Sequence, residues 1–123
     1  MHRLKVLIVE DSELMAAALA DLLTDAGVDV VGAVGSMADT LGVLARRSVD
    51  VVSLDINLGR ESGFAIADVL AARGIPFVFV TTYAASRLPA AHRDRPLIDK
   101  MKVPEELLRT CHMECQRVGA ENL

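Results

Sequence analysis

The chain has 123 residues, the length of one ordinary domain, and 52% of them are hydrophobic. Its net charge of −4 argues against nucleic acid as the main partner, because phosphate binding requires a basic face. Two cysteines are too few for a disulfide framework, and no apolar run resembles a signal peptide or is long enough to cross a bilayer. The sequence therefore predicts a cytoplasmic protein that does not enter the membrane.

Five short apolar segments predict β-strands. Several are nearly continuous runs of β-branched residues, which is typical of parallel strands that are buried on both faces. The segments, of which the last is the weakest, are Leu4–Val9, Val28–Val34, Val49–Leu54, Pro76–Val80 and Pro96–Ile98.

Helical patterns separate these strands. The first helix is expected over Ser12–Ala26, Ser36 opens the second, the third spans Ser62–Arg73, and Pro104 opens the last. The residues expected to face the core are Leu14, Ala18, Leu22 and Ala26 in the first helix, Leu41, Leu44 and Ala45 in the second, Ile66, Val69 and Leu70 in the third, and Leu107, Leu108, Cys111, Cys115 and Val118 in the last.

The alternation of strands and helices predicts an α/β fold. It indicates right-handed crossovers and one doubly wound parallel sheet of five strands, with five helices on its two faces. The connection from Thr81 to Pro96 is the irregular one, because Pro89 would interrupt a long helix there. The fourth helix is therefore expected to be short or irregular.

Chemically active residues follow four of the five predicted strands. Glu10 and Asp11 follow the first, Asp55 the third, Thr81 the fourth and Lys100 the fifth. Since ligands of open parallel sheets bind at the carboxyl ends of the strands, these side chains are expected to converge. Three neighbouring carboxylates repel one another unless a cation joins them, and Mg²⁺ suits a site with few carboxylates and several waters.

This grouping suits phosphoryl transfer. A carboxylate such as that of Asp55 is a competent nucleophile toward phosphorus and would form an aspartyl-phosphate. The transferred group needs its three equatorial oxygens neutralised. We expect the metal to contact one oxygen, Lys100 a second, and the Thr81 hydroxyl with the Thr82 amide a third.

Four motifs resemble, in order and spacing, those of bacterial response-regulator receiver domains of the stand-alone, chemotaxis-regulator-like kind. They are Val9–Ser12, Asp55–Gly59, Val80–Thr82 and Asp99–Lys100. The resemblance runs from Leu4 to about Val118. It implies one receiver domain over residues 1–123, with a core of about 4–118, a flavodoxin-like sheet and no output domain, since about five residues follow the last helix.

The resemblance also implies a function in a two-component system. Asp55 would be phosphorylated by a phosphohistidine on a sensor kinase or phosphotransfer protein, and the chain would catalyse only its own phosphorylation and dephosphorylation. Thr81 and Lys100 would tighten on phosphorylation, and output would pass through contacts with another protein. The implied Mg²⁺ ligands are Asp11, Asp55, the backbone carbonyl of Asn57 and, through water, Glu10.

Two positions depart from the family pattern. Met101 follows Lys100 where the family usually has a proline in a cis peptide bond, and we expect a trans bond because the cis form without proline costs about 2.5–4 kcal/mol. Lys102 could share the role of Lys100, although Lys100 fits the register better. Leu97 occupies the position of the family's switching aromatic residue, for which Tyr83 is a possible substitute.

Other interpretations remain open at this stage. The main alternative is a phosphorylation-independent interaction module that keeps the fold, which Met101 and the irregular fourth segment would favour. An aspartate-nucleophile phosphatase and a flavodoxin are disfavoured, since the phosphatase's nucleophile follows its first strand, whereas Asp55 follows the third. Cys111 and Cys115 are interpreted as core residues rather than metal ligands, and His2 and His92 as solvated.

Overall fold

The computed structural model describes residues 3–81, 88–99 and 109–116. Within them, five strands form one parallel sheet with the order β2-β1-β3-β6-β7. This confirms the predicted flavodoxin-like fold class and each predicted strand, with boundaries that differ by about one or two residues. The strands are β1 (Lys5–Val9), β2 (Asp29–Val34), β3 (Val51–Leu54), β6 (Phe77–Thr81) and β7 (Leu97–Asp99).

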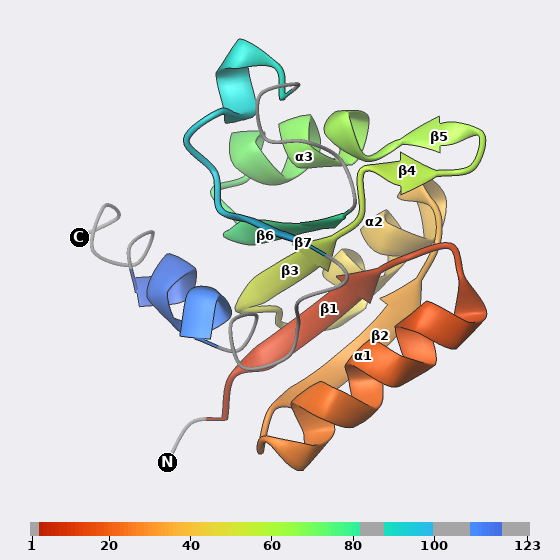
Figure 1. Cartoon of the computed structure of the whole chain (residues 1–123), viewed down its shortest axis with the longest axis vertical. Coiled ribbons are helices and arrows are strands. Elements are labelled where there is room, and N and C mark those ends of the chain that lie inside the picture. The colour runs from red at the N-terminus through yellow and green to blue at the C-terminus, as the bar shows by residue number, and fades with distance from the viewer. Residues whose placement is uncertain (1–2, 82–87, 100–108, 117–123) are drawn as a thin grey trace.

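Helices lie on both faces of the sheet (Figure 1), and a hydrophobic core is packed on each face. Alternate residues of each strand point to opposite faces, so Leu7 and Val9 belong to one core while Val6 and Ile8 belong to the other. The first core is covered by α2 (Met37–Arg46) and α3 (Gly63–Ala72), and the second by α1 (Glu13–Asp25) and the helical residues 109–116. Burial on both faces explains why the strands are almost continuously apolar.

Serine caps and glycine stops set the ends of the helices, close to the predicted bounds. The hydroxyl oxygens of Ser12, Ser36 and Ser62 each accept a backbone N–H in the first turn of α1, α2 and α3, at 3.1–3.2 Å. Gly27 and Gly74 follow α1 and α3 with φ of 87° and 69°, a conformation that side chains disfavour.

The predicted inner face of α1 is wrong. The residues buried there are Ala16, Leu19 and Leu23, whereas Leu14 is 84% exposed and Leu22 39% exposed. A strict four-residue spacing advances about 400° per step, so it drifts about 40° each time across the helix surface. The buried residues instead follow steps of three and four residues, from Ala16 to Leu19 to Leu23. The prediction had used constant steps of four residues, which leave the buried face.

Expectations for the other helices hold in part. Ile66 and Leu70 of α3 are buried as predicted, and Leu44 of α2 packs against the core. Ala45 is exposed, because the buried face of α2 is centred on Val43 and includes Thr40. Cys111 is fully buried and Cys115 is half-buried, in agreement with their interpretation as core residues.

The connection between β6 and β7 contains a short 3-10 helix, η2 (Ala90–His92), in the part that the structure describes. Pro89 precedes it with φ of −57°, which suits a helical start. The expectation of a short or irregular element is therefore met over residues 88–99. The expectation that His92 is solvated is wrong, since its side chain lies in the core with 2% exposure. None of the helices described here has the length and apolar character needed to cross a membrane.

Candidate functional site

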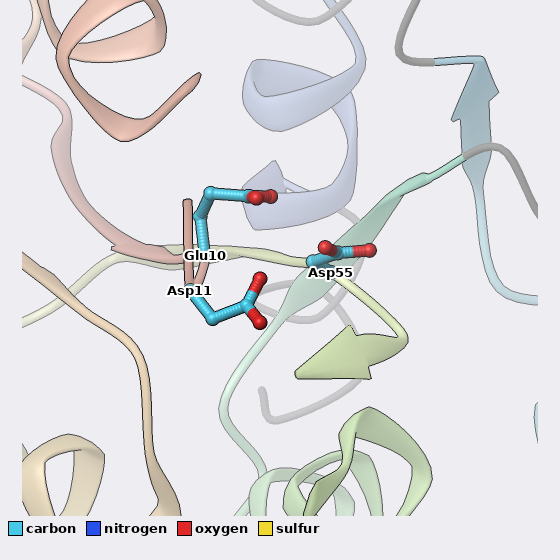
Figure 2. Close-up of side chains that lie close together, drawn as sticks. All are labelled: Glu10, Asp11 and Asp55. Carbon is cyan, nitrogen blue, oxygen red and sulfur yellow. The ribbon is translucent and has the colours of Figure 1, made fainter. Parts of the chain in front are cut away.

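Three carboxylates converge where β1 and β3 end. Glu10 and Asp11 follow β1 and Asp55 follows β3, and each contributes one oxygen to a group whose members lie within 4.8 Å of one another. Figure 2 shows the carboxyl groups of Asp11 and Asp55 directed into the same space. Glu10 and Asp55 are buried, whereas Asp11 is exposed. The structure thus brings together the three acids that the sequence singled out.

The backbone of the sheet fixes two of these acids. The Glu10 N–H donates to the Val34 carbonyl at 2.8 Å, and the Asp55 N–H donates to the Val9 carbonyl at 2.9 Å. Both acids therefore continue the hydrogen-bond ladder rather than belonging to free loops. The Glu10 carboxylate also accepts the Ser12 N–H at 3.2 Å, which links it to the start of α1.

A small hairpin that the sequence analysis did not predict follows Asp55. Its strands are β4 (Asn57–Leu58) and β5 (Glu61–Ser62), paired antiparallel across a two-residue turn. Gly59 opens that turn with φ of 68°, and a side chain there would also approach an Asp11 carboxylate oxygen at 3.3 Å. Glycine at the first position of a two-residue turn is a known hairpin signal, and it was the clue available in the sequence.

The hairpin is held against the carboxylates. The Asn57 N–H donates to an Asp55 carboxylate oxygen at 3.3 Å. On the far strand, the Glu61 carboxylate accepts the Met37 N–H at 2.7 Å, at the first residue of α2, where a negative charge suits the helix dipole. Asn57, an expected metal ligand through its carbonyl, is thus placed directly beside Asp55.

Gly63, the first residue of α3, contacts the backbone of the Asp55 loop. Its N–H donates to the Ile56 carbonyl at 2.7 Å. A β-carbon at this position would overlap the Asp55 carbonyl oxygen and lie 2.6 Å from the Ile56 α-carbon. The absence of a side chain therefore lets α3 begin against the loop, and sequence analysis had assigned Gly63 no role.

The remaining predicted residues are only partly described. Thr81 ends β6, is 2% exposed, and pairs in register with Asp99 of β7. Leu97 is half-buried on β7 and pairs with Phe79. The predictions for Thr82, Tyr83, Lys100, Met101 and Lys102, including the trans peptide bond, fall outside the described residues.

An open depression of about 380 Å³ lies beside Asn57. It is lined by the β4–β5 hairpin and by Phe64 of α3, and Arg60 supplies a positive charge to it. The surface beside Asn57 is therefore recessed, and Arg60 and Glu61 give it charges of both signs.

The carboxylate group suits a small hard cation. Its donors are oxygens, two of the three acids are buried, and closely spaced negative charges with little solvent repel strongly. Exposed Asp11 leaves one side open to water, as Mg²⁺ requires because it keeps several waters. The residues present thus fit the ion that the sequence predicted.

Known proteins share this fold. Residues 6–94 match the family model described as response regulator receiver domain. SdrG from Sphingomonas melonis Fr1 is 32% identical, with a TM-score of 0.77 over 94% of this chain and 99% of that one. The receiver domain of PhyR from Erythrobacter litoralis is 30% identical, with a TM-score of 0.75 over 94% and 92% of the two chains.

Curated relatives are longer proteins. Protein-glutamate methylesterase/protein-glutamine glutaminase 5 of Anaeromyxobacter dehalogenans is 33% identical over 72% of this chain but only 25% of its own length. The transcriptional regulatory protein PdtaR of Mycobacterium tuberculosis is 30% identical over 73% of this chain and 44% of its own length. The chain thus spans less than half of each of these relatives.

Proposed function

We propose that this protein, which belongs to the response regulator receiver domain family, is a signalling switch that accepts a phosphoryl group on Asp55. One observation carries the proposal: the buried Asp55 carboxylate lies within 4.8 Å of oxygens from Glu10 and Asp11. Such a group needs a cation, and a cation beside a carboxylate nucleophile is the arrangement that phosphoryl transfer requires.

We assign the cation site to Asp11, Asp55 and the Asn57 carbonyl, with Glu10 acting through water. When bound, Mg²⁺ would neutralise charge on the phosphoryl oxygens and on the attacking carboxylate. The donor set supports this assignment, since all of its atoms are oxygens and the Asn57 N–H already holds this loop to Asp55.

In the proposed reaction an Asp55 oxygen attacks phosphorus as the bond from phosphorus to the donor breaks. The donor, a phosphohistidine on a sensor kinase or phosphotransfer protein, keeps the electron pair and takes up a proton from water. The buried Thr81 hydroxyl would donate to one phosphoryl oxygen together with the Thr82 amide, and Lys100 would contact another. Hydrolysis of the aspartyl-phosphate would reset the switch.

Output would pass through protein–protein contacts. The chain would act as a single receiver domain in the cytoplasm, with no catalytic activity beyond its own phosphorylation and dephosphorylation. The longer relatives carry sequence beyond the matched region, so any activity in those segments belongs to them.

The test is intact-mass spectrometry after incubation with acetyl phosphate, with and without Mg²⁺, on the wild type and Asp55→Asn. We expect a gain of one phosphoryl group that requires the metal and is lost in the variant. Asn keeps the shape of the side chain but is a far poorer nucleophile, so the comparison isolates the chemistry. No adduct with acetyl phosphate and no binding of beryllofluoride would refute the proposal in favour of a phosphorylation-independent module.

A further inference from the structure

His92 of η2 is a buried histidine on the α3 side of the sheet. Its side chain is 2% exposed, and its ring packs edge-to-face against Phe77 and Phe79 of β6, with centroid separations of 5.9 and 6.0 Å. Nδ1 has no hydrogen-bond partner among the described residues. The burial of this ring attaches the connection before β7 to the sheet, and the hydrogen bond made by its other nitrogen, Nε2, adds a second attachment.

Nε2 contacts Asp68 of α3 at 2.7 Å. A carboxylate can only accept, so the ring nitrogen is the donor. The histidine end of this bond is buried, but the Asp68 side chain is 70% exposed. We call this contact the Asp68–His92 latch. In the described chain it is the hydrogen bond that joins η2 to α3, and it can be broken at Asp68 without opening the core.

The His92 ring of the latch contacts the row of β6 side chains to which Thr81 belongs. Residues 77, 79 and 81 of β6 point to the same face of the sheet, because side chains alternate along a strand. The His92 ring rests on the first two members of that row, and Thr81 is the third. A displacement of Thr81 toward a phosphoryl group would therefore shift the aromatic pair under the histidine.

The other end of the connection is attached elsewhere. Arg95 lies over the Phe77 ring, with its guanidinium carbon 4.7 Å from the ring centroid, and pairs with buried Glu114 of the helical residues 109–116 at 3.2 Å. Phe77 is farther along β6 from Thr81 than Phe79 is. Of the two attachments, the Asp68–His92 latch is thus the one whose histidine also contacts Phe79, the ring nearer to Thr81 along β6.

We propose that the Asp68–His92 latch holds residues 88–95 closed on α3 in the unphosphorylated protein and opens when Thr81 is drawn toward the phosphoryl group. This inference rests on the proposed function. It identifies residues 88–95 as the segment whose position would change when Asp55 is phosphorylated. Leu97, half-buried on β7, cannot supply an aromatic switch. His92 of the preceding 3-10 helix instead packs edge-to-face on the row of β6 side chains that ends in Thr81.

Thermodynamic reciprocity gives a test that separates a latch from a plain structural contact. If phosphorylation opens the latch, then breaking the latch must favour the activated state by the same factor. We expect Asp68→Ala to bind beryllofluoride, in the presence of Mg²⁺, about three- to tenfold more tightly than the wild type, the factor that corresponds to one hydrogen bond. Asp68→Asn keeps an acceptor oxygen for Nε2 and should stay near the wild-type affinity.

The control for charge is Asp21→Ala. Asp21 is exposed on α1, so its removal changes the net charge equally but leaves the latch intact. Isothermal titration of the wild type and the three variants measures the affinities. Hydrogen exchange of the wild type should show faster exchange at residues 88–95 when beryllofluoride is added.

The outcomes are distinct. Tighter binding by Asp68→Ala alone supports the latch. Equal affinity in all four proteins, or weaker binding by Asp68→Ala, overturns it while the proposed function stands, provided that the wild type binds beryllofluoride. Tighter binding by Asp21→Ala as well would reduce the effect to net charge and also overturn it. No binding of beryllofluoride by the wild type would overturn the latch, and the proposed function falls with it if acetyl phosphate also gives no adduct.

Discussion

Replacing Gly63 by alanine tests how the proposed phosphorylation loop is built. The added β-carbon would overlap the Asp55 carbonyl oxygen and come within 2.6 Å of the Ile56 α-carbon and 2.9 Å of its carbonyl oxygen. All three are backbone atoms, so no side chain can rotate away. Either α3 must move away from the loop that carries Asp55, or that loop must move away from α3.

The size of the effect follows from these contacts. Overpacking a closed site costs about 1–3 kcal/mol, and a clash with backbone belongs at the upper end of that range. Movement would also weaken the bond from the Gly63 N–H to the Ile56 carbonyl, at 2.7 Å in the wild type, which adds about 1 kcal/mol. We therefore expect a loss of about 4 kcal/mol in the free energy of unfolding and slower phosphorylation by acetyl phosphate.

Gly42→Ala is the matched control. Gly42 lies inside α2, where an added β-carbon would meet only the far end of the Arg46 side chain, at 4.0 Å. Alanine there should stabilise the protein by about 0.5–1 kcal/mol, because glycine is a poor helix former. Urea unfolding followed by circular dichroism measures both variants. If Gly63→Ala were as stable as Gly42→Ala, α3 would not start against the Asp55 loop as described.

Three further predictions concern other parts of the fold. Glu61→Ala should cost about 0.5–1 kcal/mol in urea unfolding and Glu61→Gln less, because the lost group caps the first turn of α2. Leu19→Ala should cost about 2–5 kcal/mol and Leu14→Ala less than about 0.5 kcal/mol, and the reverse order would show that the assigned buried face of α1 is wrong. Burial, followed by the neighbouring thiol of Cys115, raises the pKa of Cys111 from 9.0 to about 12. The unfolded chain therefore loses this proton first as pH rises, so stability should fall between about pH 9 and 12 by up to about 1.4 kcal/mol per pH unit, and unfolding of Cys111→Val should lack that component.

The strands were predictable because their environment is uniform. Each strand of a doubly covered parallel sheet is apolar at nearly every position, so β1 and β6 stood out without knowledge of their neighbours. The acids at their carboxyl ends were predictable for a related reason, since parallel strands bring their ends to one edge. Glu10 and Asp55 thus met as a consequence of topology.

The misses share a different cause. The burial of His92 depends on two rings and a carboxylate from elements far away in sequence, and no local pattern encodes that set. The β4–β5 hairpin has strands of two residues, too short to show a period, and only Gly59 signalled the turn. The face of α1 was missed because two apolar stripes compete on that helix, and contacts with the sheet decide between them.

The two sides of the proposed site are held by different kinds of interaction. Asp55 is fixed by backbone: its N–H continues the sheet, and the loop after it is bounded by Gly63 without an intervening side chain. The described connection to β7 is instead attached through His92 and Arg95, each by a side-chain contact. Side-chain contacts of this kind are worth about 1 kcal/mol each, whereas displacing a sheet strand breaks several bonds at once. A phosphoryl group added to Asp55 would therefore displace the segment that is held by side-chain contacts rather than the Asp55 loop. We expect the structural change at residues 88–95, which precede the backbone pairing of β7 with β6.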